Sequence, residues 1–234
     1  MKKINLLLTL SSLNAVIVIF ERLSPTTQII LQPYSYLRVH EVVQMLIFIN
    51  ISVVLPFLLL KTISNNFETI KDKKGTFYTV LFIMGIYLYA AGNGLHEVAS
   101  FLFNTFCDTK HVVANACGSM FANDYYVGNI IFFVGFYLTD LSLILLELRR
   151  PDKTFKRKDL IILLVNSFVF AFTLIAYGAF DRVLVGFWYT AIAAVSFDAL
   201  LLWSKKKFSQ LPVTLYFTAA YTIATIIIVL IRFH

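Results

Sequence analysis

The chain has 234 residues, of which 59% are hydrophobic and only 14% are charged. A soluble domain carries about 25% charged residues, so the composition excludes an ordinary soluble protein and indicates a single membrane domain, residues 1–234. The net charge of +7 would suggest nucleic acid as a partner of a soluble protein. Here the basic residues lie in the loops between apolar segments, so membrane lipids are the expected partners and nucleic acid is not.

Seven apolar segments follow one another along the chain, separated by short loops rich in Pro, Asn, Asp and Lys. A helix of about 20 apolar residues crosses the hydrocarbon core of a bilayer. The sequence therefore predicts an all-α, polytopic membrane bundle of seven transmembrane helices. The predicted helices are residues 4–20, 41–60, 77–104, 125–147, 160–179, 184–203 and 212–231.

The first segment also has the charge pattern of a signal peptide, because Lys2 and Lys3 precede its apolar stretch. Ser11, Ser12 and Asn14 interrupt that stretch, and no A-x-A cleavage site follows it. We therefore expect a retained first helix. Cleavage would leave six helices in the same orientation.

The Lys and Arg residues predict the orientation, because cytoplasmic loops are enriched in both. With the N-terminus inside, all but five of the 20 basic residues fall on the inner side. This predicts a cytoplasmic N-terminus and an external C-terminus. The inner residues are Lys2, Lys3, Lys61, Lys71, Lys73, Lys74, Arg149, Arg150, Lys153, Lys156, Arg157, Lys158, Lys205, Lys206 and Lys207, and the outer ones are Arg22, Arg38, Lys110, Arg182 and Arg232.

Both cysteines, Cys107 and Cys117, lie in the predicted outer loop at 106–123. An oxidising compartment permits a disulfide, which would contribute about 2–3 kcal/mol in a loop this short. Two free thiols are the alternative, and we favour the disulfide.

The third segment carries a polar stripe in its second half. Asn93, His96, Glu97, Ser100 and Asn104 are spaced i, i+3, i+4, i+7 and i+11, so they share one helix face. Ionisable residues cost about 2.5–3.5 kcal/mol near the bilayer centre. A histidine and a glutamate on one stripe therefore indicate a functional site in the outer half of the membrane.

Polar residues at the start of two other helices lie at a similar height. They are His40, Glu41 and Gln44 near the second helix, and Asp124 and Asn129 near the fourth. Because lipid cannot satisfy such groups, we expect all three helices to turn them toward one outward-facing pocket. The predicted catalytic residues are His96, Glu97 and Asp124, and the predicted substrate-binding residues are Glu41, Gln44, Asn93, Ser100 and Asn129.

Each of these groups also has a structural interpretation. Gln44, Ser100 and Asn129, taken singly, are typical of hydrogen bonds between membrane helices. A second group, toward the cytoplasm, comprises Asp140, Asn166 and Asp198. Asp198 lies near the Lys205–Lys207 run, whereas Asp140 has no such neighbour and fits half of a proton relay.

Two kinds of chemistry suit the predicted pocket. Imidazoles and carboxylates are ligands of zinc or iron, so one hypothesis is a divalent metal held by His40, His96, Glu97 and Asp124. The other is that His96 and Glu97 exchange protons as acid and base without a metal. The last helix has no lysine, which excludes a retinal Schiff base.

Two stretches carry a resemblance to a group of bacterial proteins. Gly92-Asn93-Gly94-Leu95-His96-Glu97-Val98-Ala99-Ser100 and Asn123-Asp124-Tyr125-Tyr126-Val127-Gly128-Asn129 cover about a tenth of the chain. They resemble the G-H-G-x-H-x-x-A-N and D-E-x-x-G-H segments of poorly characterised bacterial polytopic membrane proteins. The resemblance implies a bacterial inner or plasma membrane. Asn93 and Asn129 stand where those proteins have histidine, and Ser100 where they have asparagine.

Three functions fit these features. The first is a membrane-embedded enzyme that acts on a lipid or isoprenoid through the His/Glu/Asp site. The second is a non-catalytic accessory or binding protein, in which the polar residues join helices. The third is a small proton-coupled transporter with Glu97 and Asp140 as carriers, although no inverted repeat is evident.

Overall fold

The structure, a computed structural model, describes residues 1–149 and 154–234. The described residues form helices and no strand. They contain seven helical spans that are long and apolar enough to cross a membrane, which confirms the predicted fold class. Arg150 and Lys153, assigned above to an inner loop, lie outside the described residues.

Several spans are built from more than one element. The π-helical turns η2 (Gln44–Phe48) and η4 (Asn123–Gly128) join α2 to α3 and α5 to α6, so each group forms one span. Short 3-10 helices are η1 (Pro25–Gln28), η3 (Glu68–Ile70) and η5 (Phe208–Gln210). The α-helices are α1 (Lys2–Glu21), α2 (Val39–Val43), α3 (Ile49–Ile63), α4 (Lys73–Phe106), α5 (Ala116–Ala122), α6 (Asn129–Arg149), α7 (Arg157–Phe180), α8 (Val185–Trp203) and α9 (Pro212–Phe233).

The observed spans match the predicted segments closely, with one large difference. The fourth span begins at Ala116 rather than at 125, because α5 continues into α6 through η4. Much of the predicted outer loop at 106–123 is therefore helix. This extension places Asp124 inside a helical turn rather than before one.

Local sequence signals explain where the helices begin. The Asp72 side chain accepts a hydrogen bond from Gly75 N at 2.8 Å and caps α4. Pro212 occupies the first position of α9, which needs no backbone donor there. Two other donors in the first turn of α9, Val213 N and Thr214 N, bond to Glu147 of α6 at 2.8 and 2.7 Å. A buried carboxylate on one helix thus caps another.

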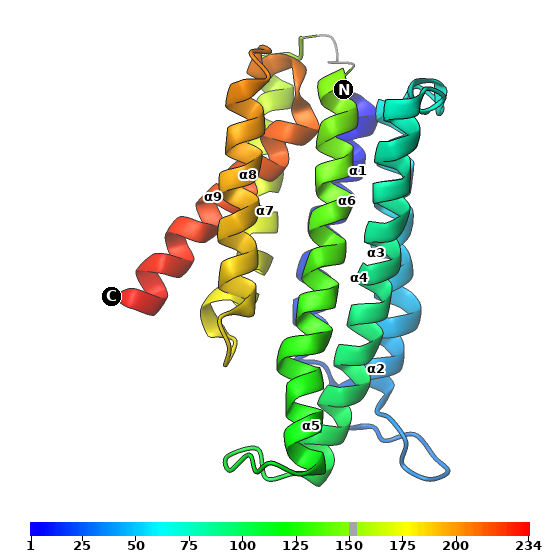
Figure 1. Ribbon diagram of the computed structural model, residues 1–234, viewed down its shortest axis with the longest axis vertical. Helices are drawn as coiled ribbons and strands as arrows, with labels where there is room; N and C mark the ends of the chain where they lie inside the picture. The colour runs from blue at the N-terminus through cyan, green and yellow to red at the C-terminus, as the bar shows by residue number, and fades with distance from the viewer. Residues whose placement is uncertain (150–153) are drawn as a thin grey trace.

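Helices α4 and α6 lie side by side (Figure 1), and glycines let their backbones touch. A Cβ atom at Gly92 would lie 2.2 Å from Phe132 N, and one at Gly135 would lie 2.1 Å from Tyr89 N. Neither distance is sterically allowed. The close α4–α6 contact therefore depends on residues without side chains.

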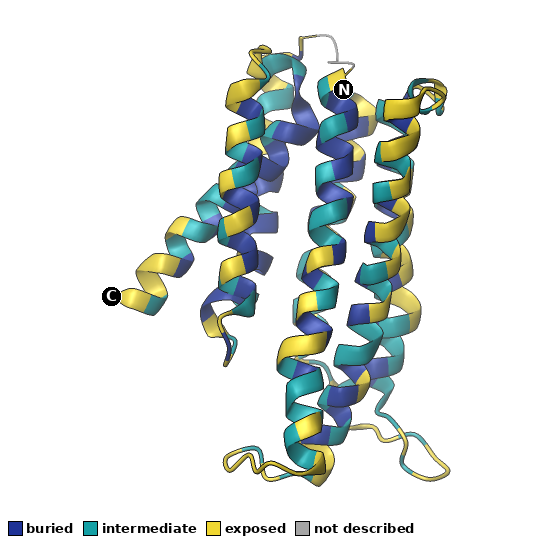
Figure 2. Ribbon diagram, in the orientation of Figure 1, coloured by how far each residue is buried: buried dark blue, intermediate teal, exposed yellow. Residues whose placement is uncertain are grey.

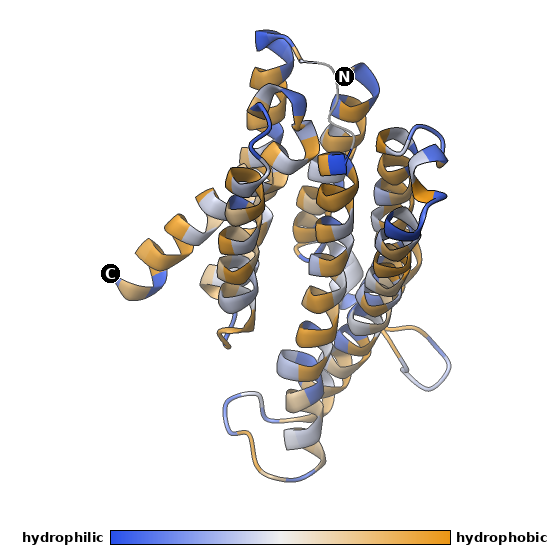
Figure 3. Ribbon diagram, turned by 45° about the horizontal axis from the view of Figure 1, so that its top comes forward, coloured by the Kyte–Doolittle hydropathy of each residue, from blue (hydrophilic) through white to orange (hydrophobic). Residues whose placement is uncertain are grey.

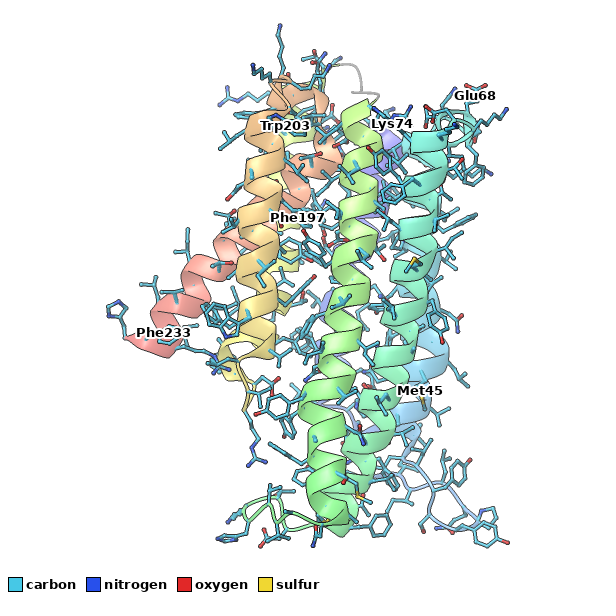
Figure 4. All side chains as sticks on the ribbon, viewed as in Figure 1. Met45, Glu68, Lys74, Phe197, Trp203 and Phe233 are labelled. Atoms are coloured by element: carbon cyan, nitrogen blue, oxygen red, sulfur yellow. A yellow bond between two sulfur atoms is a disulfide. The ribbon has the colours of Figure 1, made fainter. Side chains whose placement is uncertain are left out.

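The described core is rich in aromatic side chains. Tyr216 and Tyr221 of α9 are fully buried. Phe197 of α8, labelled in Figure 4, stacks on Tyr137 of α6 with centroids 5.5 Å apart. Toward its C-terminus α9 diverges from α6, and Phe233 lies at its outlying end (Figures 1 and 4).

The outward faces of the helices are exposed and apolar. Tyr87, Phe168 and Val195 are 71%, 62% and 72% exposed, and Figure 2 shows exposed residues repeating along the outside of the helices. Figure 3 shows hydrophobic residues along the helical spans and hydrophilic residues gathered at the ends. A hydrocarbon environment accepts such a surface, whereas water does not.

The two ends of the bundle differ in their loops. The N-terminus lies at the same end as η3 and the loop between α8 and α9, whereas the loops at 22–38 and 107–115 lie at the opposite end (Figure 1). The described basic loops predicted to be cytoplasmic therefore share one end. Which end faces the cytoplasm stays a prediction.

Candidate functional site

A histidine–aspartate pair joins α4 to the α5–α6 span at the end opposite the N-terminus. His96 Nδ1 lies 2.8 Å from Asp124 Oδ1 and 3.1 Å from the Asp124 carbonyl oxygen. Asp124 is 2% exposed. Gly128 permits this approach, because a Cβ there would lie 3.0 Å from His96 Cα.

The neighbours of the His96 ring define its tautomer. Both groups facing Nδ1 are acceptors, so Nδ1 carries the proton. Nε2 lies 3.3 Å from Arg22 Nη2, a group that only donates. These contacts correspond to the imidazole form whose Nδ1–H points at Asp124 and whose Nε2 accepts from Arg22.

Arg22, directly after α1, brings a positive charge to this pair. Its Nη2 lies 3.5 Å from Glu97 Oε1, and its guanidinium carbon lies 5.5 Å from the centre of the Tyr177 ring. The Glu97 side chain is 4% exposed, whereas that of Arg22 is 36% exposed. The arginine is thus held by a buried carboxylate and an aromatic face while remaining accessible.

A second polar cluster, next to the first, involves Glu21 and His40. His40 Nδ1 lies 2.5 Å from Glu21 Oε2, and His40 Nε2 lies 3.8 Å from Glu97 Oε2. Gln44 Nε2 donates to the same Glu21 oxygen at 2.8 Å. His40 therefore connects two buried carboxylates from α1 and α4, and Glu97 links this cluster to Arg22.

The outer chamber is a cavity of about 460 Å³ beside the His96–Asp124 pair. Leu23 and Phe180 line it and are 80% and 71% exposed, so its rim is apolar. Burial raises the pKa of Asp181, which lines the chamber just after α7. The polar lining residues are Arg22, His96, Ser100, Asn104, Asp124, Asn129 and Asp181.

The inner cavity lies deeper in the bundle and has a volume of about 110 Å³. Aromatic and aliphatic side chains from α1, α3, α4, α6, α7 and α9 line most of it. Gln44, Asn93 and Asp140 are among its few polar lining residues. Tyr177 lines both the inner cavity and the outer chamber.

The predicted single pocket is thus divided in two. His96, Ser100, Asp124 and Asn129 share the outer chamber, as expected. Gln44 and Asn93, the predicted substrate-binding neighbours, line the inner cavity instead.

Glu41 belongs to neither cavity. Its carboxylate accepts from Arg38 Nε at 2.8 Å and from Arg38 N at 2.9 Å, which fixes the start of α2. Both Glu41 oxygens are thus used in capping α2, and its predicted binding role stays a prediction.

Sequence reasoning missed Glu21 and Arg22. They form a charged dipeptide directly after the apolar run of the first segment, where the arginine serves only as an orientation signal. The sequence shows that Glu21 and Arg22 lie at a helix end. It does not show which helix faces them, and their role depends on that neighbouring helix.

The polar residues nearer the N-terminal end of the bundle mostly join helices. Asn166 Nδ2 donates to Thr9 Oγ1 at 2.7 Å, and Thr222 Oγ1 donates to Asp198 at 3.1 Å. Both are interhelical hydrogen bonds of the structural kind. Asp140 differs, because it lines the inner cavity.

No metal-ligand set is evident in the described part of the chain. Among residues 1–149 and 154–234, no three His, Cys, Asp or Glu side chains converge closely enough to hold an ion. His96 and Asp124 form a pair, and His40 sits with Glu21 and Glu97 at up to 3.8 Å. The metal hypothesis therefore has no geometric support.

A disulfide joins Cys107, directly after α4, to Cys117 in the first turn of α5. It closes the loop that connects the two helices carrying His96 and Asp124. The relative position of these helices is therefore fixed covalently at this end of the bundle.

No protein-family model, no curated protein and no solved structure matches this chain.

Proposed function

We propose that the protein is a membrane-embedded enzyme that hydrolyses an ester bond of a lipid in the outer chamber. One observation carries the proposal. His96 Nε2 faces an accessible chamber, while Nδ1 bonds to the Asp124 backbone carbonyl at 3.1 Å and lies 2.8 Å from the Asp124 carboxylate. A histidine oriented through its second ring nitrogen, with a carboxylate beside it, is the arrangement of a general base.

The reaction assigns a task to each group. His96 Nε2 removes a proton from water, and the water oxygen attacks the carbonyl carbon of the ester. Asp124 stabilises the resulting imidazolium, which then returns the proton to the departing alcohol oxygen. The products are a carboxylic acid and an alcohol, so atoms and charge balance.

Arg22 supplies the second requirement of acyl transfer, a positive group beside the base. Negative charge develops on the carbonyl oxygen during attack, and a fixed cation stabilises it. Arg22 Nη2 lies 3.3 Å from His96 Nε2, so one substrate carbonyl can approach both. Glu97, predicted as a catalytic acid or base, holds Arg22 in this proposal and does not transfer protons.

The rim of the chamber supports a lipid as the substrate. Leu23 and Phe180 are exposed apolar side chains at the ends of α1 and α7. Acyl chains can pass between them from the surrounding bilayer, while the ester group reaches the polar lining.

A non-catalytic binding role is the alternative, and one observation favours it. Arg22 is already paired with Glu97 and contacts the base, as expected for groups that only join helices. A transporter would need a hydrated route past Asp140, and the cavity that Asp140 lines is mainly apolar.

The test is hydrolysis of a panel of fluorogenic lipid esters by the purified protein in nanodiscs. Substitution of the base, His96→Ala, should lower kcat by about 100-fold or more, and Asp124→Asn should lower it similarly. Both variants should elute as the wild type does in size-exclusion chromatography.

The matched control is the exposed pair on the 107–115 loop, His111 and Asp108, whose side chains lie 3.1 Å apart. His111→Ala should leave hydrolysis unchanged. Absence of wild-type hydrolysis across the panel, or equal rates for wild type and His96→Ala, would overturn the proposal and favour the binding role.

A further inference from the structure

The inner cavity contains a buried carboxylate with no positively charged partner. Asp140 is 2% exposed and lies on the cavity wall. Within residues 1–149 and 154–234, no Lys, Arg or His side chain forms an ion pair with it. An isolated acid is among the least favourable groups to place in the middle of a membrane. A ligand that pairs with Asp140 would explain why the acid is there.

The hydrogen bonds of Asp140 leave one of its oxygens open. Tyr221 of α9 donates to Oδ2 at 2.7 Å, and the Tyr221 hydroxyl is itself bonded to that of Tyr189 on α8. Oδ1 receives no hydrogen bond from the described residues. The two tyrosines therefore hold the Asp140 carboxylate in place through Oδ2. Oδ1 remains available to accept a hydrogen bond from a ligand in the cavity that Asp140 lines.

Aromatic rings surround this part of the cavity. Phe136 and Phe170 both line it, with centroids 6.0 Å apart, and Tyr216 lies 5.6 Å from Phe170. Aromatic faces attract an ammonium group, and they do so most strongly where water is excluded. A carboxylate beside several rings therefore matches a protonated amine better than a neutral group.

We propose that the inner cavity binds a lipophilic amine whose protonated nitrogen donates to Asp140 Oδ1. The cavity volume of about 110 Å³ suits a slender ligand with a single alkyl chain. Its wall on α6 runs from Phe132 to Leu143, a length of about 16 Å at 1.5 Å per residue. Asp140 lies one turn from the inner end of this wall, so the hydrocarbon chain extends toward Asn93.

This site is separate from the outer chamber, and it does not depend on the proposed hydrolysis. Tyr177 is a wall residue of both cavities, but none of the groups assigned to His96 chemistry contacts Asp140. The inference therefore adds a second ligand site to the protein.

The test measures equilibrium binding of radiolabelled dodecylamine and dodecanol to the full chain in zwitterionic nanodiscs, with empty nanodiscs as background. The amine should bind saturably and about 100-fold more tightly than the alcohol, because it alone can pair with the buried charge. Asp140→Asn should weaken amine binding to the level of the alcohol and leave alcohol binding unchanged.

Three further variants separate this result from misfolding and from the outer site. Asp198→Asn changes an acid outside both cavities and should bind the amine as the wild type does. Ser11→Phe, which fills cavity space, should abolish binding of both ligands. His96→Ala should have no effect on amine binding.

Equal affinity for dodecylamine and dodecanol would overturn the proposal. So would amine binding that Asp140→Asn leaves intact, or an absence of saturable amine binding to the wild type.

Discussion

At the scale of single residues, the properties of the outer-chamber side chains depend on contacts with residues that are distant in the sequence. His96 acquires a defined tautomer only because Asp124 and Arg22 approach its two nitrogens from different helices. Glu97, the next residue, shares Arg22 with His96 and also faces His40. Of these two adjacent residues, only Glu97 links Arg22 to the His40 cluster.

The chamber residue Asp181 and the loop residue Asp108 should respond to substitution in opposite ways. Burial raises the pKa of Asp181 above its usual value of 3.8. Ionised Asp181 is therefore less favourable in the folded than in the unfolded protein, and the stability falls as the pH rises from 3.8 through the raised pKa. At neutral pH, Asp181→Asn should raise the stability by less than about 1 kcal/mol. Thermal unfolding at neutral pH and well below pH 3.8 measures this, and the difference should vanish in acid.

Asp108→Asn is the matched control with the reverse sign. The backbone amide of Lys110, followed by the His111 side chain, lowers the pKa of Asp108 below 3.8. Its stabilising contribution is complete above pH 3.8 and is lost as the pH falls through the lowered pKa. Asp108→Asn should therefore lower the melting temperature at neutral pH. A shift of the same sign in both variants would contradict this account.

The sequence indicates which residues of the site are unusual but not how they pair. His96 and Asp124 are recognisable because ionisable side chains in membrane helices need a partner. Their separation from Asn93 and Gln44 into two cavities could not be predicted, because it depends on where Tyr177 of α7 lies. Helical periodicity describes the face of one helix and contains no information about its neighbour.

At the scale of elements, the α4–α6 contact brings two backbones together and positions the site. It is made by Gly85 and Gly92 on α4 and by Gly135 on α6. A Cβ atom at Gly94, two residues after Gly92, would have no neighbouring atom within 4 Å. Of the two glycines that flank Asn93, only Gly92 serves close packing, and α4 remains helical through both.

Gly135→Ala should therefore disrupt the bundle, whereas Gly94→Ala should not. The added methyl group of Gly135→Ala would collide with the α4 backbone at Tyr89, at an expected cost of about 1–3 kcal/mol. Gly94→Ala should leave the stability unchanged or slightly higher, because alanine favours helix. Melting temperatures in detergent compare the two directly, and equal losses would argue against the close packing.

The boundaries of the elements were largely predictable because the lengths of apolar runs determine them. The exception is the nine-residue extension before residue 125, where α5 continues the fourth span. Residues 116–124 include Cys117, Gly118 and Asn123, a composition typical of a loop. Their helical state follows from contacts with α4, such as the packing of Phe121 against Phe103 at 5.5 Å.

At the scale of the whole molecule, the asymmetry between the two ends predicts how the protein sits in its membrane. The end that carries the N-terminus and η3 is basic, and the opposite end carries the disulfide and the outer chamber. Because basic loops are retained on the cytoplasmic side, we expect the outer chamber to face away from the cytoplasm.

Labelling of single introduced cysteines tests this orientation. Both native cysteines are in the disulfide, so an introduced thiol is the only free one. A membrane-impermeant maleimide should label Lys110→Cys in intact cells and should label Lys73→Cys only after permeabilisation. Lys206→Cys should behave as Lys73→Cys does, and the reverse pattern would mean an inverted protein.

The proline in the middle of α3 has a consequence for the interior as a whole. Pro56 has no N–H group, so the carbonyl of Ser52, four residues earlier, lacks its usual helical donor. Both residues line the inner cavity. A guest molecule that donates a second hydrogen bond to this carbonyl would be attached at two points, which would favour guests long enough to reach both over shorter ones.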